Sequence, residues 1–197
     1  MRVKEGNKSE DIQEAAIKIF AEYGYFNAKI SKIAEVAGVA IGSVYVYFKN
    51  KEDILSNIFN TLWKNMYENS FYLKGNKHLS PTDKLDKMID TIFDIYARHP
   101  ELAIVINNEF GTYLSLHKNK NPEYYDKFFD TAGEIITEGI RKNVFASYIN
   151  VTLFKHIIIG SFRELVNHWA ANRKSVKLDE IRKSFKSVMK YGIMKHK

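Results

Sequence analysis

The chain has 197 residues, no cysteine and a formal net charge of +7. This length allows one or two domains with a sizeable core, and the absence of cysteine excludes disulfides, thiolate metal ligands and cysteine nucleophiles. The longest apolar runs, 102–106 and 156–162, are far shorter than the roughly 18 residues of a membrane span. The polar N-terminus lacks the apolar segment of a secretion signal, so we expect a cytoplasmic protein with no membrane contact.

The positive charge is confined to the C-terminal end of the chain. Residues 1–55 and residues 56–172 each carry equal numbers of basic and acidic side chains. Residues 173–197 carry nine basic side chains against two acidic ones, which accounts for the whole excess. Net charge therefore gives no support to nucleic-acid binding by the N-terminal region, and that function must rest on a motif.

The first 55 residues predict short helices separated by glycine stops. Gly24 should close the first helix, and Gly38 should end the second because glycine adopts the left-handed C-cap conformation without strain. Two short helices joined by a glycine-containing turn predict a helix-turn-helix, whose second helix reads the major groove of DNA. The expected helices are 9–23, 31–37, 41–48 and a longer one that starts at 51.

The segment 41–48 has the side-chain pattern of a recognition helix. Val44 and Phe48 are four residues apart, so they can face the core together. The outward side then carries small and hydroxyl-bearing residues, which can approach phosphates closely and donate hydrogen bonds to them. We expect Tyr45 and Lys51 to contact phosphates and the remaining outward side chains to set base preference. The residues expected to contact DNA are Ser31, Lys32, Ile41, Gly42, Ser43, Tyr45, Val46, Tyr47 and Lys51.

The remainder of the chain also predicts only helices. Apolar residues at helical spacing extend the helix from 51 well beyond the needs of a three-helix domain, and loop signals follow at 75–76 and 80–81. We expect an all-α fold: a helix-turn-helix DNA-binding domain, residues 1–50, joined by a long helix to a helical effector-binding and dimerisation domain, residues 51–197. The later helices are expected at 85–96, 100–113, 121–140, 150–171 and 178–194.

Sequence motifs resemble those of a known family. The run GVAIGSVYVYFKNKEDIL, preceded by SKIA at 31–34, resembles the DNA-binding signature of the tetracycline-repressor (TetR) family. It departs from that signature at Ala40, where the family often has a capping serine. HPELAIVINNEF, TEGI and IIIGSFRELVNHWAAN are more loosely similar to the acyl-CoA-responsive fatty-acid-degradation (FadR) branch. The resemblance implies a repressor that binds a palindromic operator and is released by a hydrophobic effector, a long-chain acyl-CoA.

The last two predicted helices favour a homodimer. The helix 150–171 is apolar or small on more than one face, and a helix of this kind is usually covered on two sides. The helix 178–194 has a narrower apolar stripe. We expect both to pair with their symmetry mates in a four-helix interface, since two recognition helices must read half-sites about 34–36 Å apart.

The middle helices leave the effector site open to two interpretations. Their mid-helix glycines, at 111, 133, 139 and 160, indicate either close helix packing or room for an elongated apolar ligand. Basic residues of the last helix (Arg182, Lys183, Lys186 and Lys190) either hold CoA phosphates, by the resemblance, or form a solvated face. The candidate ligand-binding residues are Glu109, Phe110, Tyr113, Ile136, Phe162 and Trp169.

The sequence leaves two alternatives to an acyl-CoA-responsive repressor. A TetR-like regulator of multidrug efflux, sensing lipophilic cationic or aromatic compounds, would need acids such as Glu109 and Glu164 beside aromatic rings. An enzyme is the remote alternative, because the six histidines are scattered and neither a metal-ligand spacing nor a P-loop or GxSxG element occurs. We expect no catalytic residue, metal site or cofactor; the expected partners are double-stranded DNA, a small hydrophobic effector and a second copy of the chain.

Overall fold

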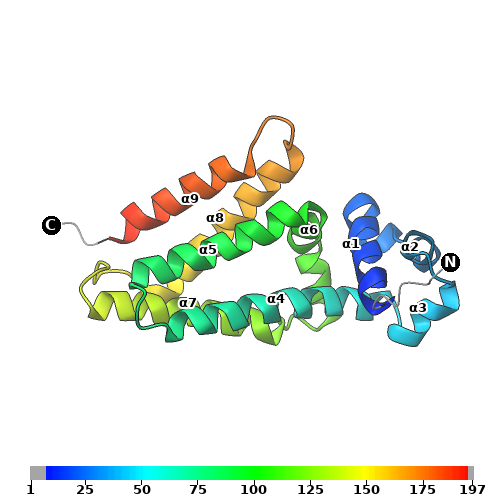
Figure 1. Ribbon diagram of the computed structural model, residues 1–197, viewed down its shortest axis with the longest axis horizontal. Coiled ribbons are helices and arrows are strands. Elements are labelled where there is room, and N and C mark those ends of the chain that lie inside the picture. The colour runs from blue at the N-terminus through cyan, green and yellow to red at the C-terminus, as the bar shows by residue number, and fades with distance from the viewer. Residues whose placement is uncertain (1–7, 195–197) are drawn as a thin grey trace. The chain divides into compact units, whose positions relative to one another are not determined.

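The computed structural model describes residues 8–194, and these residues form nine α-helices (Figure 1). The predicted all-α class is confirmed. None of the described helices, taken singly, is long and apolar enough to cross a membrane. The helices are α1 (Lys8–Asn27), α2 (Ile30–Ala37), α3 (Ile41–Tyr47), α4 (Lys51–Gly75), α5 (Pro81–Arg98), α6 (Pro100–Leu116), α7 (Glu123–Arg141), α8 (Val151–Ala171) and α9 (Leu178–Ile193).

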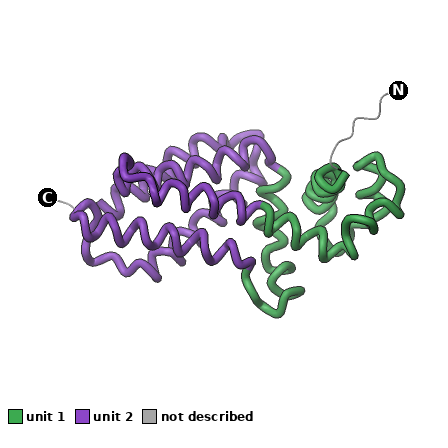
Figure 2. The backbone as a smooth tube through the Cα atoms, turned by 60° about the horizontal axis from the view of Figure 1, so that its bottom comes forward, with its two compact units in different colours: residues 1–61, 101–121 green, residues 62–100, 122–197 purple. Residues whose placement is uncertain are grey.

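Contacts between residues divide the chain into two compact units (Figure 2). Unit 1 comprises the described residues up to Thr61 together with Glu101–Asn121, and unit 2 comprises Leu62–Pro100 and the residues from Pro122 onward. The first part of α4 and nearly all of α6 therefore pack with the N-terminal helices. The domain boundary expected after residue 50 separates DNA binding from effector binding rather than one set of contacts from another. That functional boundary stays a prediction.

The three N-terminal helices of unit 1 pack around small and medium apolar residues. Ile12, Ile33 and Val44, one from each helix, have no exposed surface. Gly24 interrupts α1 with a φ of 74°, and Gly38 caps α2 in the left-handed conformation with a φ of 68°, as the sequence predicts. The axes of α2 and α3 are bent by 97°, which lies in the range of helix-turn-helix motifs.

Side-chain caps and aromatic contacts fix α4 within unit 1. The Asn50 carboxamide oxygen accepts a hydrogen bond from the Asp53 backbone N–H, and the Asp53 carboxylate accepts one from the Lys49 N–H. These bonds satisfy amides that a helix start leaves without partners. Further along α4, the Phe59 ring lies 5.8 Å from Phe110 and 4.9 Å from Tyr113 of α6.

In unit 2, α5 packs against α7 and α9, and α8 packs against both of these. A capping box starts α5: the Ser80 hydroxyl accepts from the Asp83 N–H, and the Asp83 carboxylate accepts from the Ser80 N–H. The Phe162 ring of α8 lies 5.4 Å from Phe93 of α5 and 5.6 Å from Phe185 of α9. These rings join three helices in one core.

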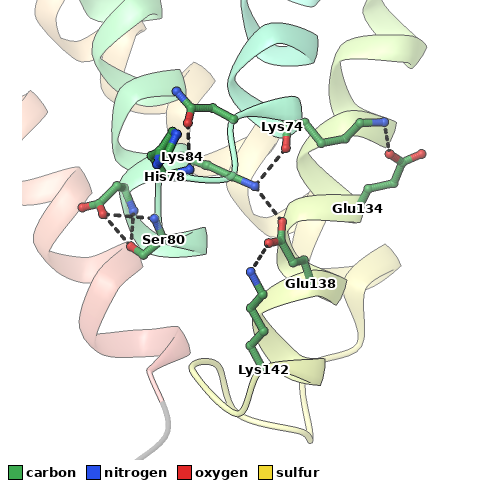
Figure 3. A network of polar contacts seen from close by, with 9 residues as sticks. Lys74, His78, Ser80, Lys84, Glu134, Glu138 and Lys142 are labelled. Carbon is green, nitrogen blue, oxygen red and sulfur yellow. Dashed lines mark hydrogen bonds and ion pairs between the residues drawn. The ribbon is translucent and has the colours of Figure 1, made fainter.

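A buried ion pair connects α5 to α7 in the same unit (Figure 3). The Lys84 side chain is only 3% exposed. Its ammonium donates to the Glu138 carboxylate at 2.9 Å and to the Lys74 carbonyl, near the end of α4, at 2.9 Å. Glu138 also accepts from Lys142 at 2.6 Å. A buried charge needs such partners, because its desolvation is costly without them.

Candidate DNA interface and effector-binding residues

The α3 helix presents an exposed apolar and aromatic surface. Val44 and Phe48 are 0% and 3% exposed, which places them in the core as the sequence predicts. Val46, by contrast, is 78% exposed and Tyr45 is 54% exposed. Ile41 and Tyr47, also predicted to contact DNA, are exposed as well. Four large exposed side chains on one short helix form a surface that is available to a partner.

The start of α3 leaves space for a close approach from outside. Ala40 occupies the N-cap position, and no side chain caps the first turn of the helix. A Cβ atom built on Gly42 would meet nothing within 4 Å. Ser43, the third predicted contact in this turn, is half-buried. Uncapped amides beside an open backbone suit an anionic partner.

The predicted contacts on α2 are also exposed. Ser31 and Lys32 both lie on the outer side of that helix. The Lys32 ammonium is 2.8 Å from the Glu35 carboxylate, and the hydrogen bond to Glu35 raises the pKa of Lys32. Because exposed ion pairs contribute little, Lys32 can exchange Glu35 for a phosphate.

Lys51 differs from the expectation. Its ammonium donates to the carbonyl oxygens of Tyr25, Phe26 and Ala28, at 2.5, 3.0 and 3.0 Å. It also lies 4.5 Å from the centre of the Tyr25 ring. An ammonium has three donors, so all of them are used inside the protein, and burial lowers the pKa of Lys51. This geometry argues against the phosphate contact expected from the sequence and gives Lys51 the role of capping the end of α1.

Glu109 also has a partner within the protein. Its side chain is buried, with 7% of the residue exposed, and its carboxylate accepts a hydrogen bond from the Tyr25 N–H at 2.9 Å. Glu109 of α6 and Lys51 of α4 therefore hold the same short segment of backbone. We call this arrangement the Tyr25 clamp: Lys51, Glu109 and the backbone of residues 25–28. No sequence pattern reveals it, because all four of its hydrogen bonds join a side chain to a backbone atom more than 20 residues away.

The six predicted ligand-binding residues are divided between the two units. Glu109, Phe110 and Tyr113 lie in unit 1, where the rings of Phe110 and Tyr113 pack against Phe59. Ile136, Phe162 and Trp169 lie in unit 2, together with a surface cavity of about 510 Å³. None of the six lines that cavity, whose wall carries three carboxylates and two cations and does not suit an acyl chain. Its lining residues are Asp130, Gly133, Glu134, Thr137, Glu138, Arg141, Val151, Thr152 and Lys155.

Two of the four mid-helix glycines serve close helix packing, the first of the two predicted roles. A Cβ on Gly139 would lie 2.1 Å from the Phe145 ring, and one on Gly133 would lie 3.2 Å from Val151. These two glycines serve close packing. A Cβ on Gly111 or Gly160 would meet nothing within 4 Å, so packing with the described residues does not require glycine at either position.

Two cations of α9 are engaged by acids of α5. Arg182 is 2.6 Å from Asp94, and Lys186 is 2.9 Å from Asp90. From the sequence, these cations could either bind CoA phosphates or form a solvated face. The structure gives Arg182 and Lys186 a third role, because their ion pairs join α9 to α5. Lys183 is exposed.

Comparison with known proteins identifies the family. Residues 12–58 match "Bacterial regulatory proteins, tetR family", and residues 65–192 match "YsiA-like protein, C-terminal region". The "Fatty acid metabolism regulator protein" of Bacillus subtilis (strain 168) is 32% identical over 186 residues, which cover 94% of this chain and 95% of the relative. The chain belongs to the tetR family.

Solved structures of tetR-family regulators agree with the fold. The fatty acid degradation regulator FadR from Bacillus halodurans has a TM-score of 0.82 and 30% identity, covering 96% of this chain and 98% of that one. FadR from Bacillus subtilis, solved in complex with stearoyl-CoA, has a TM-score of 0.80 and 32% identity, covering 93% and 98%. The resemblance noted in the sequence, to the tetR family and to its FadR branch, is confirmed.

Proposed function

We propose that this tetR-family protein is a cytoplasmic, dimeric repressor that binds a palindromic operator and is released by a long-chain acyl-CoA. The effector assignment rests on one observation: the chain is similar over 93% of its length to a regulator solved with stearoyl-CoA. DNA binding is supported by the exposed surface of α3, with Val46 and Tyr45 at its centre. The described residues contain no cluster of three or more metal-ligating side chains, and we propose no enzymatic role.

The dimer proposal rests on the outer face of α8 and α9. Leu153 and Ile157 of α8 are 59% and 64% exposed, and Val188 and Tyr191 of α9 are 73% and 68% exposed. Large apolar side chains gathered on two neighbouring helices mark an interaction surface. A second copy of the chain is the partner that paired half-sites require.

Release from DNA requires that the effector and the operator prefer different conformations. The coupling free energy between two such sites is typically about 1–3 kcal/mol, and each ligand weakens the other by the same factor. The Tyr25 clamp is suited to carry this coupling, because residues of α4 and α6 hold the end of α1 together. A small shift of either helix would move the helix-turn-helix and re-space the two recognition surfaces.

The experiment begins with an operator selected in vitro from random DNA by the purified protein. Operator affinity is then measured by fluorescence anisotropy with and without palmitoyl-CoA. We expect palmitoyl-CoA to lower the affinity by about 10–100-fold, as the coupling free energy implies, and CoA alone to have little effect. Equal affinity in the presence and absence of saturating palmitoyl-CoA would contradict the proposal.

The same assay tests the drug-sensing alternative. A lipophilic cation, tetraphenylphosphonium, replaces palmitoyl-CoA in a parallel titration. The alternative needs acids such as Glu109 and Glu164 beside aromatic rings; the Glu109 carboxylate already accepts a hydrogen bond from the Tyr25 N–H, and Glu164 is exposed. We therefore expect the cation to leave operator affinity unchanged; release by the cation alone would favour the efflux regulator instead.

A further inference from the structure

A buried donor in unit 2 has no acceptor among the described residues. The indole Nε1–H of Trp63, on α4, is shielded from solvent and makes no hydrogen bond with them, and the residue is 7% exposed. The sequence does not single out this tryptophan, because its spacing on the helix is that of an ordinary core residue. Buried polar groups are nearly always bonded, so each exception requires an explanation.

The surroundings of Trp63 are aromatic and come from α7. The Trp63 ring lies 4.7 Å from Tyr125, at an angle of 82°, and 5.9 Å from both Phe128 and Phe129. An edge-to-face arrangement lets an N–H approach a ring face, but such a contact is much weaker than a hydrogen bond to oxygen. Leaving a buried donor without an oxygen acceptor destabilises the fold.

This combination defines the chemistry of a ligand. We propose that the Trp63 indole N–H donates a hydrogen bond to the carbonyl oxygen of an acyl group whose alkyl chain packs among the rings of Tyr125, Phe128 and Phe129. The part of the ligand bound here needs one acceptor and an apolar chain. Tyr125 and Phe129 are only half-buried, whereas Phe128 is 4% exposed. The two half-buried rings can therefore turn aside without opening the core.

Two kinds of acyl compound carry such a carbonyl. The thioester group is uncharged and offers one carbonyl acceptor, whereas a free fatty acid is a carboxylate that needs several donors or a cation when it is buried. Burial raises the pKa of Tyr125, and the positive charge of Arg163, on α8, opposes that rise; Arg163 is an exposed residue. The geometry therefore favours the thioester. This inference rests on the proposed acyl-CoA effector and specifies where its carbonyl binds.

The position of Trp63 on α4 connects ligand binding to the DNA-binding helices. Trp63 and Lys51 belong to the same continuous helix, α4. A ligand that bonds to Trp63 contacts the helix whose first residue holds the end of α1. Recognition of the thioester would then act on the element that supports the helix-turn-helix.

The test removes the donor and the acceptor separately, using isothermal titration calorimetry. The ligands are palmitoyl-CoA, S-hexadecyl-CoA, which is a thioether without the carbonyl, and palmitate. With the native protein we expect palmitoyl-CoA to bind about tenfold more tightly than the thioether, the size of one net hydrogen bond to a buried donor. We expect palmitate to bind more weakly than both.

Two variants complete the cycle. In Trp63→Phe the thioester and the thioether should bind with equal affinity, because the donor is gone. Phe129→Leu is the matched control: it removes ring contact but keeps the indole, so both ligands should weaken while their tenfold ratio remains. The arm with the native protein does not depend on the folding of either variant.

The outcomes separate this inference from the proposed function. Equal binding of thioester and thioether by the native protein would overturn the Trp63 contact while leaving acyl-CoA as the effector. An unchanged ratio in Trp63→Phe would do the same. Tighter binding of palmitate than of palmitoyl-CoA would replace the thioester by the carboxylate. Failure of the native protein to bind palmitoyl-CoA at all would overturn the proposed effector and the contact together.

Discussion

At the scale of single residues, Lys51 has two possible roles in the DNA-binding domain: a contact to DNA phosphate or a cap of α1. As a phosphate contact it would matter only when DNA is present. As the cap of α1 it holds three carbonyl groups that a helix end leaves without partners. A lysine at position 51 is compatible with either role, and the direction of its side chain decides between them.

Lys51→Met should therefore destabilise the protein in the absence of DNA. We expect a loss of about 2–3 kcal/mol in the free energy of unfolding, because hydrogen bonds from a charged donor are lost and the carbonyls lose their partner. Urea denaturation measures this loss. Lys49→Met is the matched control, since the Lys49 side chain is exposed and its replacement should change stability by less than about 0.5 kcal/mol. A Lys51 variant as stable as the Lys49 variant would restore the phosphate role.

Tyr45 and Val46 should affect DNA binding in different ways. Tyr45→Phe removes a hydroxyl expected to contact phosphate, so it should weaken binding to every sequence by about three- to tenfold. Val46→Ala removes a side chain expected to make an apolar contact with a base edge, and it should instead change the preference between sequences. Anisotropy with the selected operator and with scrambled DNA separates the two effects. If Val46→Ala weakened binding to the operator and to scrambled DNA equally, Val46 would not contribute to sequence recognition.

Among helices, the contact of α5 with α7 depends on one buried ammonium. Glu138→Gln leaves Lys84 buried without its counter-charge. We expect a loss of about 2–3 kcal/mol, at or below the lower limit of the roughly 3–5 kcal/mol for a broken buried pair, because the amide oxygen of glutamine still accepts a hydrogen bond. Lys84→Met removes the charge itself and leaves Glu138 with Lys142. Its cost should be below about 1 kcal/mol. Denaturation curves of the two variants test this asymmetry, and equal losses would contradict it.

The same carboxylate predicts a dependence on pH. The hydrogen bonds from Lys142 and from Lys84 hold the pKa of Glu138 below its ordinary value of 4.5. A group with a lowered folded-state pKa stabilises the fold above the unfolded pKa, and that contribution disappears as pH falls through the folded pKa. The native protein should thus lose stability more steeply than Glu138→Gln below about pH 4.5. Parallel slopes for the two proteins would show that Glu138 does not titrate in this way.

The sequence predicted every helix, because glycine stops, proline starts and apolar spacing are local signals. It could not predict where long polar side chains end. Lys51, Glu109 and Arg182 all bind groups more than 20 residues away, and their partners are chosen by tertiary packing. The sequence also placed the start of α7 slightly too early: the helix begins at Glu123, after Pro122 as its N-cap, and not at residue 121.

For the whole molecule, the exposed face of α8 and α9 predicts self-association. Ile157→Glu places a charge on a side chain that is 64% exposed in one chain, so the folded monomer should be unaffected. We expect the dimer dissociation constant to rise by at least about a hundredfold, because a charge would be buried without a partner. Sedimentation at micromolar concentration measures it. Tyr72→Glu, at a position 72% exposed on α4, is the matched control and should remain dimeric; a monomeric native protein would contradict the interface.

The Tyr25 clamp has a consequence for genetics. Selecting cells in which repression has failed should return substitutions at Lys51 and Glu109, and at Gly24, whose φ of 74° brings the backbone to the carboxylate. These residues contact neither DNA nor the effector in our proposal, because their partners lie within the protein. Such alleles should be recessive when they unfold the protein and dominant when they leave it dimeric, since a mixed dimer would hold only one recognition helix in place.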